Sequence, residues 1–281
     1  MTIRKLFAAL LCAALALFVL VPAAGSVPAE AHRGATKVKD LILTLSSTDE
    51  PESGSMVSFA GSGPASLAGV SVVLRRQVVS DGQWIKVTKV PIAADGTFEV
   101  EGVATGVGAN KWQVQAIQKT GSGKKATKTK HLSGVVSTTV FAWYYLPENY
   151  AVDSEYMDPG SVTIGGTGYP KSIYAWGSSG RRGRTAWAEY NISYRCKAVN
   201  AKIGVDDQAE TGFRAKFYML LDGAETSLGQ LGLGPAKDVT VDSASRLRLR
   251  VEVRPGDGIP DSDIDGSAAF GDLRALCSGK P

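Results

Sequence analysis

Histidine and cysteine are scarce in this chain: its 281 residues include two His and three Cys. The two histidines, His32 and His131, are far apart in the sequence, and neither has a cysteine beside it. Zinc sites, Cys–His pairs and Ser-His-Asp triads each need a histidine close to other ligands or to a nucleophile. The sequence therefore argues against these classes of metalloenzyme and hydrolase.

Long apolar runs are also rare. The run Leu6–Val21 follows Arg4 and Lys5 and precedes the cleavage signal Ala29-Glu30-Ala31. These features are typical of a secretory signal peptide, which we assign to residues 1–31. The run is shorter than the roughly 20 apolar residues that span a bilayer. We therefore expect a secreted or cell-surface protein with no membrane insertion after signal cleavage.

The cysteines fit an exported chain. Cys12 lies inside the apolar run, after the bulky Leu11, which does not suit a lipid-attachment site. Signal cleavage leaves Cys196 and Cys277, and exported proteins fold in an oxidising compartment, so we predict a single disulfide. Closing a loop of about 80 residues stabilises a fold by about 4 kcal/mol in chain-entropy estimates. The alternatives, a metal pair or a catalytic thiol, lack supporting histidines.

The net charge of +4 is modest but unevenly distributed. Residues 32–135 are net basic and residues 136–281 are slightly acidic. The acidic balance argues against nucleic-acid binding by the second region through phosphate neutralisation, and we expect no nucleic-acid partner. The tract Lys119–Lys130 is not a phosphate-binding P-loop, because Gln118 stands where that motif needs glycine and Lys125 where it needs Ser or Thr. We interpret the tract as a solvated hairpin, with contacts to anionic wall polymers as the alternative.

Alternation of apolar and polar residues recurs along the chain, whereas helical periodicity is scarce. In Arg246–Arg254 four aliphatic side chains alternate with five charged ones, and Phe213–Met219 alternates similarly. Asp-Gly pairs that suit tight hairpin turns lie at residues 81–82, 95–96 and 222–223. Short strands at this spacing predict an all-β fold with two β-sandwiches, at residues 32–135 and 136–281.

The first of these regions resembles the small immunoglobulin-like domains of secreted bacterial proteins. The matching segments are Val70–Arg76, Gln83–Val87 and Ala94–Val100, the last of which carries an Asp-Gly-x-Phe turn. The resemblance implies an immunoglobulin-like sandwich that acts as a spacer or adhesion module and has no chemistry of its own.

The second region carries a longer series of motifs. In chain order they are Val162–Ile173 (VTIGGTGYPKSI), Ala201–Asp207 (AKIGVDD), Asp222-Gly223, Arg246–Leu249 (RLRL), Gly256–Ile259 (GDGI) and Phe270–Arg274 (FGDLR). Together they resemble the NPCBM/NEW2 family, a carbohydrate-binding domain found beside secreted glycoside hydrolases. The resemblance implies a galactose-binding-like jelly-roll sandwich that holds glycans. It also implies that the first and last strands are neighbours, which would bring Cys196 and Cys277 within reach.

The candidate ligand-binding residues of this region are Trp176, Asp207, Arg254, Asp265 and Phe270. Several positions depart from the family pattern. Trp176 stands where the family has His, Ser172 where it has Gly, and Phe270 where it has Trp. Histidine and tryptophan supply hydrogen bonds and a stacking face at a sugar pocket, so these departures weaken any transfer of sugar specificity.

The acidic segment Gly256–Gly266 (GDGIPDSDIDG) has the spacing of a calcium loop. A Ca²⁺ site would use Asp257, Asp261, Asp263, Asp265 and Asp272, the last at the twelfth place of an EF-hand-like series. However, that place holds Asp rather than the usual Glu, and the preceding segment has the pattern of a strand rather than a helix. Two alternatives stay open, a solvated acidic turn and direct hydrogen bonds to a sugar without metal.

Aromatic rings are the other surface on which sugars stack. The candidates are Phe141–Leu146, Trp176 and Trp187, although core packing explains most aromatic residues in strands. Trp176 lies in a Gly/Ser-rich stretch, where exposure fits best.

Catalysis has little support in the second region. Glycoside hydrolysis needs two carboxylates across the scissile bond, and Asp206 and Asp207 are adjacent in a predicted strand, so they point to opposite faces. We therefore expect a secreted, non-catalytic protein that recognises extracellular or cell-wall glycans. The alternative is a structural or protein-interaction module of the cell envelope with a decayed sugar site.

Overall fold

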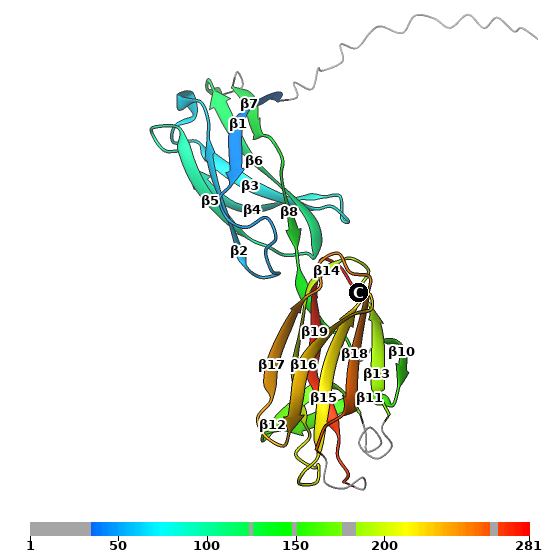
Figure 1. Ribbon diagram of the computed structural model, residues 1–281. Coiled ribbons are helices and arrows are strands. Elements are labelled where there is room, and N and C mark those ends of the chain that lie inside the picture. The colour runs from blue at the N-terminus through cyan, green and yellow to red at the C-terminus, as the bar shows by residue number, and fades with distance from the viewer. Residues whose placement is uncertain (1–34, 124–125, 148–150, 176–183, 259–263) are drawn as a thin grey trace, which may run out of the picture. The chain divides into compact units, whose positions relative to one another are not determined.

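The structure is a computed structural model that describes residues 35–123, 126–147, 151–175, 184–258 and 264–281. The predicted signal peptide, residues 1–31, lies outside the described residues. Within the described ranges, no helix is both long and apolar enough to cross a membrane. The described chain is almost entirely strand and turn (Figure 1), which confirms the all-β prediction.

The first half forms one sheet in the order β4-β3-β6-β7-β1-β2-β5, with β8 also paired to β6. Its elements are β1 (Thr36–Leu45), β2 (Met56–Ser62), the 3₁₀ helix η1 (Ala65–Leu67), β3 (Ser71–Val78), β4 (Trp84–Pro91), β5 (Thr97–Val103), β6 (Gly108–Thr120), β7 (Thr127–Ser133) and β8 (Val136–Val140). β1 pairs antiparallel with β2 and parallel with β7, so it joins two groups of strands. Both groups bury apolar side chains in one core, where Phe59 and Trp112 lie 5.1 Å apart between ring centroids.

The lysine-rich tract is a hairpin, as predicted. β6 and β7 pair from Gln115 opposite Leu132 to Thr120 opposite Thr127. The sheet of the first half also includes β8, so its hydrogen bonding runs past residue 135, where we predicted the domain boundary.

The second half contains two antiparallel sheets. Its strands are β9 (Ala142–Tyr145), β10 (Ala151–Glu155), β11 (Met157–Ile164), β12 (Thr167–Ala175), β13 (Ala186–Asn191), β14 (Cys196–Val205), β15 (Arg214–Leu221), β16 (Ala224–Gly232), β17 (Lys237–Asp242), β18 (Arg248–Pro255) and β19 (Ala268–Cys277). We call β10-β13-β18-β15-β16 the front sheet. We call β11-β12-β19-β14-β17, with β9 paired to β19, the back sheet.

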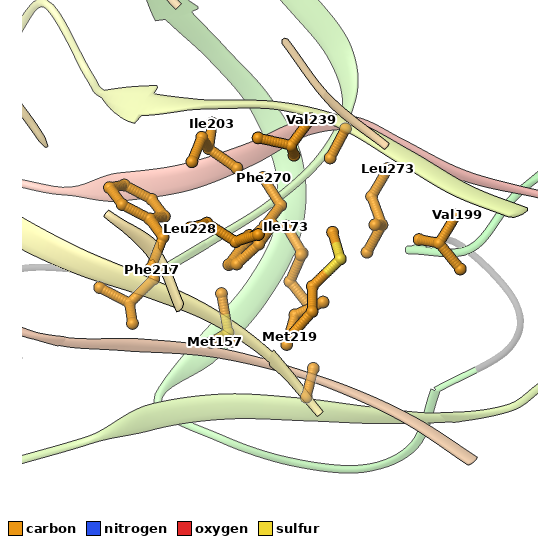
Figure 2. Close-up of a cluster of buried hydrophobic side chains, with 14 of the residues drawn as sticks. Met157, Ile173, Val199, Ile203, Phe217, Met219, Leu228, Val239, Phe270 and Leu273 are labelled. Carbon is orange, nitrogen blue, oxygen red and sulfur yellow. The ribbon is translucent and has the colours of Figure 1, made fainter. Parts of the chain in front are cut away.

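The predicted alternation places the core between these two sheets. On β18, Leu249, Val251 and Val253 are fully buried, and Arg248, Arg250 and Arg254 alternate with them on the outward face. Phe217 of the front sheet meets Phe270 of the back sheet edge to face, with ring centroids 5.6 Å apart. Figure 2 shows these rings among the aliphatic and methionine side chains of the same cluster. The second half is therefore a β-sandwich, as predicted.

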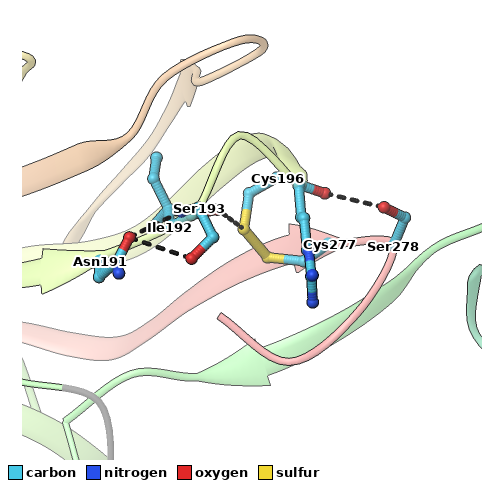
Figure 3. Close-up of a disulfide and its surroundings, with 7 residues drawn as sticks. Asn191, Ile192, Ser193, Cys196, Cys277 and Ser278 are labelled. Atoms are coloured by element: carbon cyan, nitrogen blue, oxygen red, sulfur yellow. Dashed lines mark hydrogen bonds between the residues drawn. A yellow bond between two sulfur atoms is a disulfide. The ribbon is translucent and has the colours of Figure 1, made fainter.

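The predicted disulfide between Cys196 and Cys277 is present. The two residues are direct partners in the register of β14 and β19 (Figure 3). Cys196 thus lies on a middle strand of the half rather than on its first strand. The amide of Ser278 also donates to the carbonyl of Arg195, so the C-terminal end of the chain is fastened to the turn before β14.

Candidate functional site

The predicted ligand residue Asp207 has a structural role. Its two carboxylate oxygens each accept a 2.7 Å hydrogen bond, one from the amide of Gly165 and one from that of Gly166. Both glycines have positive φ, 56° and 77°, as the tight turn between β11 and β12 requires. The carboxylate therefore fixes this turn, which explains why the motif pattern has a Gly-Gly pair and an Asp at position 207.

Phe270 does not suit the stacking role that we predicted for it. Its ring is fully buried in the core against Phe217, so it presents no face to a ligand. Burial follows from the alternation of β19, in which Phe270 points toward the front sheet. Trp176 lies outside the described residues.

The described members of the predicted calcium set have different partners. Asp257 accepts a 2.6 Å bond from Lys216 of the front sheet, whereas Asp272 lies within β19 of the back sheet and accepts a 3.4 Å bond from the amide of Lys171. The amide of Asp265 donates to Glu210 at 2.9 Å. Among the described residues, no group of three His, Cys, Asp or Glu side chains could hold a metal ion. Asp261 and Asp263 lie outside the described residues, so the calcium site stays a prediction.

The fifth predicted ligand residue, Arg254, is part of a row of side chains on the outward face of the front sheet. It donates to Glu252 at 2.6 Å and 2.9 Å, also bonds Glu225, and stacks on Tyr218 at 3.9 Å from the ring centroid. The bond to Glu225 and then that to Glu252 raise the pKa of Arg254 above its usual value. Its guanidinium is therefore committed to neighbours within the protein.

The row continues across the sheet to Trp187. Glu252 is the register partner of Trp187 on one side and of Tyr218 on the other. Arg250 forms an ion pair with Glu252, with 2.8 Å between its Nε and Glu252 Oε1, and lies 3.9 Å from the centroid of the Trp187 ring. Glu252 is only 5% exposed, and a buried carboxylate needs such paired cations. The row thus anchors Arg250 beside the indole.

A hollow of about 520 Å³ opens at the β10 end of this row. Its lining residues are Glu155, Tyr156, Arg184, Thr185, Trp187 and Arg250. The indole N–H of Trp187 donates to Glu155 Oε2 at 3.1 Å, between register partners on β13 and β10. Arg184 bonds the hydroxyl of Tyr156 and lies 5.3 Å from the centroid of its ring. Two aromatic side chains therefore meet two guanidinium groups and a carboxylate.

Tyr156 adopts an uncommon backbone conformation at this hollow. Its φ is 57°, and left-handed conformations cost a non-glycine residue roughly 1–2 kcal/mol. The residue stands between β10 of the front sheet and β11 of the back sheet, and its side chain is 41% exposed. Strain of this kind concentrates at functional sites, because the surrounding structure must hold it in place. Tyr194 also has a positive φ, so the strain marks Tyr156 as a candidate functional residue only together with the place of its ring at the hollow.

Sequence reasoning found Trp187 but missed the rest of the hollow. In Ala186–Tyr190 the tryptophan shares its face with Glu189, and this parity alone could have placed its ring outside. No sequence pattern marks the positive φ of Tyr156. Arg184 and Glu155 come together only through the pairing of β10 with β13.

A smaller hollow, of about 250 Å³, lies on the back sheet where β11 and β12 pair. It is lined by Pro159, Gly160, Pro170, Lys171 and Ser172. The last three belong to the opening motif of the second half. None of these lining residues is aromatic, so this hollow has less to offer the face of a sugar ring.

The arrangement at the larger hollow suits a ligand with both an apolar face and hydroxyl groups. Aromatic rings accept the C–H face of such a ligand, and a few polar groups fix its orientation. Among the described lining residues Glu155 has the sole carboxylate, and it is bonded to the indole.

Comparison with known proteins supports the motif pattern of the second half. Residues 137–274 match the family model of the NPCBM/NEW2 domain, which confirms the predicted resemblance there. The match leaves out the first half, so its immunoglobulin-like character stays a prediction. A solved structure of CBM51-2 in complex with GlcNAc and INT domains from Clostridium perfringens ZmpB is similar at 13% identity and a TM-score of 0.38. That likeness covers 61% of this chain and 38% of the other. A comparison with curated proteins gave no match.

Proposed function

We propose that the protein is a secreted, non-catalytic carbohydrate-binding protein whose sugar site is the hollow at Tyr156 and Trp187. The observation that carries the proposal is the meeting of these two aromatic residues with Glu155, Arg184 and Arg250 inside the NPCBM/NEW2 domain. The ligand we infer is an extracellular or cell-wall glycan.

Each residue of the hollow would make a different kind of contact with the sugar. Tyr156 offers the more exposed ring, because Arg184 lies 5.3 Å from its centroid whereas Arg250 lies 3.9 Å from the centroid of Trp187. Trp187 in turn holds Glu155 through its indole N–H, so the carboxylate is oriented to accept bonds from sugar hydroxyls. Arg184 and Arg250 supply donors. Removing the Tyr156 ring should therefore cost more affinity than removing any single polar group.

The test is glycan-array binding by the mature protein, followed by titration of the best ligand. Tyr156→Ala should weaken binding at least tenfold. Tyr194→Ala is the matched control, because Tyr194 is also an exposed tyrosine with positive φ, at 63% and 58°, and lies away from the hollow in the turn before β14. Equal binding by the two variants would reject the hollow as the sugar site.

A second function, a structural or protein-interaction module of the envelope, is favoured by a different observation. Guanidinium groups lie 3.9 Å from the ring centroids of both Trp187 and Tyr218, and Phe270 is buried, so several aromatic faces already have partners within the chain. If the folded, unaltered protein binds no glycan on the array, this function replaces the first.

We also propose that the acidic segment binds Ca²⁺ through Asp257, Asp261, Asp263, Asp265 and Asp272. The support is the spacing of the carboxylates along the sequence. Millimolar CaCl₂ should raise the midpoint of thermal unfolding, and a chelator should reverse the change. An unchanged midpoint would leave the segment as a solvated turn. In a separate measurement, glycan binding with and without chelator would distinguish direct contacts to the sugar from metal-dependent ones.

A further inference from the structure

On five strands of the first-half sheet, the outward side chains that the structure describes include cations and no acid. These strands, labelled in Figure 1, are β4, β3, β6, β7 and β1, which are consecutive in the order of the sheet. The side chains that alternate with the buried core residues on these strands include Lys37, Lys39, Arg75, Lys86, Lys89, Lys111, Lys119, Lys128 and Lys130. We call this set the basic face. Within the described part of the chain, no salt bridge joins any of them to an acid.

The acidic residues of the same half lie elsewhere. Glu99 and Glu101 are on β5, which is at the far end of the sheet from β4 in strand order. Asp81 and Asp95 lie in turns, and Asp40 bonds the buried His131 at 2.8 Å. The separation of sign is therefore a property of the sheet and not only of the lysine-rich tract.

The register places like charges side by side. Lys119 is directly opposite Lys128, and Lys37 is directly opposite Lys130. Burial first, and then the charges of Arg75 and Lys37, lower the pKa of Lys130. Like charges in direct register destabilise a sheet. These like-charged pairs bring no visible gain in stability to the fold, and such pairs are expected where a surface has a function.

The spacing makes the charges act together. Neighbouring strands lie about 4.8 Å apart and alternate residues along a strand about 6.7 Å apart, both shorter than the Debye length of about 8 Å at physiological salt. Summed potentials of one sign attract extended polyanions more strongly than they attract small ions.

Polar groups between the cations narrow the class of partner. Gln113 and Gln115 face outward from β6, and Gln115 accepts a 3.3 Å bond from Arg75. Ile117 and the ring of Trp84, which lies 5.6 Å from the Arg75 guanidinium, add apolar surface. Amide and apolar groups suit the hydroxyls and C–H faces of sugars, which a bare polyphosphate lacks.

We propose that the basic face binds an acidic polysaccharide, with the lysines pairing carboxylates that repeat along the chain. This site is separate from the hollow in the second half and does not depend on the proposed function. The protein would then have two surfaces that bind polysaccharides. The hollow would bind a sugar ring, and the basic face would bind the regularly spaced negative charges of an acidic polymer.

The test uses the mature full-length protein and polygalacturonate as the probe, with neutral dextran for comparison. We expect polygalacturonate binding that weakens steeply with salt and no dextran binding by this face. The variant K119Q/K128Q/K130Q should bind at least tenfold more weakly and show a smaller dependence on salt, as expected when fewer counterions are released. The control K202Q/K216Q/K280Q removes the same charge from the second half and should bind like the unaltered protein.

Three results would overturn the proposal. They are no polygalacturonate binding at low salt, equal loss in both triple variants, and tighter binding to polyphosphate or duplex DNA than to polygalacturonate. Misfolding can be separated from loss of contact, because removing repulsive lysines should leave the melting temperature unchanged or higher. If the melting temperature and the affinity of K119Q/K128Q/K130Q both fall, the loss of binding comes from the fold, and this result also counts against the proposal.

Discussion

The outward faces of the two halves of this chain carry charge in opposite ways. On the front sheet, the outward arginines of β18 have carboxylate partners: Arg248 lies 3.4 Å from Glu189, and Arg250 and Arg254 share Glu252. On the basic face, cations stand opposite cations. Both faces follow the same alternation along their strands.

The difference shows that alternation determines which side chains face outward but not whether their charges are balanced. On a balanced face each charge has a partner of opposite sign within the protein, so a rise in ionic strength lowers the stability of the fold only slightly. An unbalanced face stores repulsion that a polyanion or salt can relieve. The first arrangement suits a site whose side chains must be held in position, and the second suits attraction of a charged polymer.

Removing the disulfide should have the largest effect on stability, and it tests whether the two halves unfold independently. Replacing Cys196 and Cys277 together by Ala should lower the stability of the second half by about 4 kcal/mol, because the unfolded chain gains the freedom of an 81-residue separation. Hydrogen exchange should quicken in β14 and β19 and stay unchanged in β3 and β6. An equal change in both halves would show that they unfold as one cooperative unit.

Removing Glu252 should break the balance of the front sheet. Glu252→Ala leaves Arg250 and Arg254 without their shared carboxylate, and we expect a loss of about 2–3 kcal/mol in urea unfolding. Glu189→Ala is the control, because the Glu189–Arg248 pair is more exposed and should contribute less than about 1 kcal/mol. Equal effects would mean that burial of Glu252 has no energetic consequence.

Asp207 tests whether one carboxylate fixes the β11–β12 turn. Asp207→Ala removes two charged hydrogen bonds to backbone amides, which should cost about 1–3 kcal/mol. Asp242→Ala is a local comparison, because Asp242 accepts a bond from Ala244 only two residues away. Chemical unfolding of both variants measures the difference, and a loss as small as that of Asp242→Ala would remove Asp207 from its structural role.

Much of the fold could be predicted because alternation and Asp-Gly turns are local signals. The strand at Phe213–Met219, the hairpin at 119–130 and the disulfide all follow from residues that lie close together in sequence or from the pairing of two cysteines. The family motifs were equally readable, but several of them mark the fold: Asp207 fixes a turn and Phe270 fills the core.

The candidate site could not be predicted in the same way. The hollow depends on which strand pairs with β13 and on the positive φ of Tyr156, and neither has a local signature. The basic face was visible only in part, since the tract at 119–130 supplies three of its lysines while Lys37, Arg75 and Lys86 join it through strand order. Non-local pairing therefore creates both surfaces.

The smallest expected effect is the change in local stability of the two halves with salt. It directly compares the balanced charges of the front sheet with the unbalanced charges of the basic face. Raising NaCl from 0.05 to 0.5 M shortens the Debye length to about 4 Å, so it screens repulsion on the basic face and attraction on the front sheet. Hydrogen exchange should slow in β6 and β7, by up to about 1 kcal/mol in opening free energy, and should quicken slightly in β15 and β18. Measuring both halves in one molecule cancels general effects of the salt. In K119Q/K128Q/K130Q the slowing of β6 and β7 should disappear, and if it persists, repulsion among these lysines is not its cause.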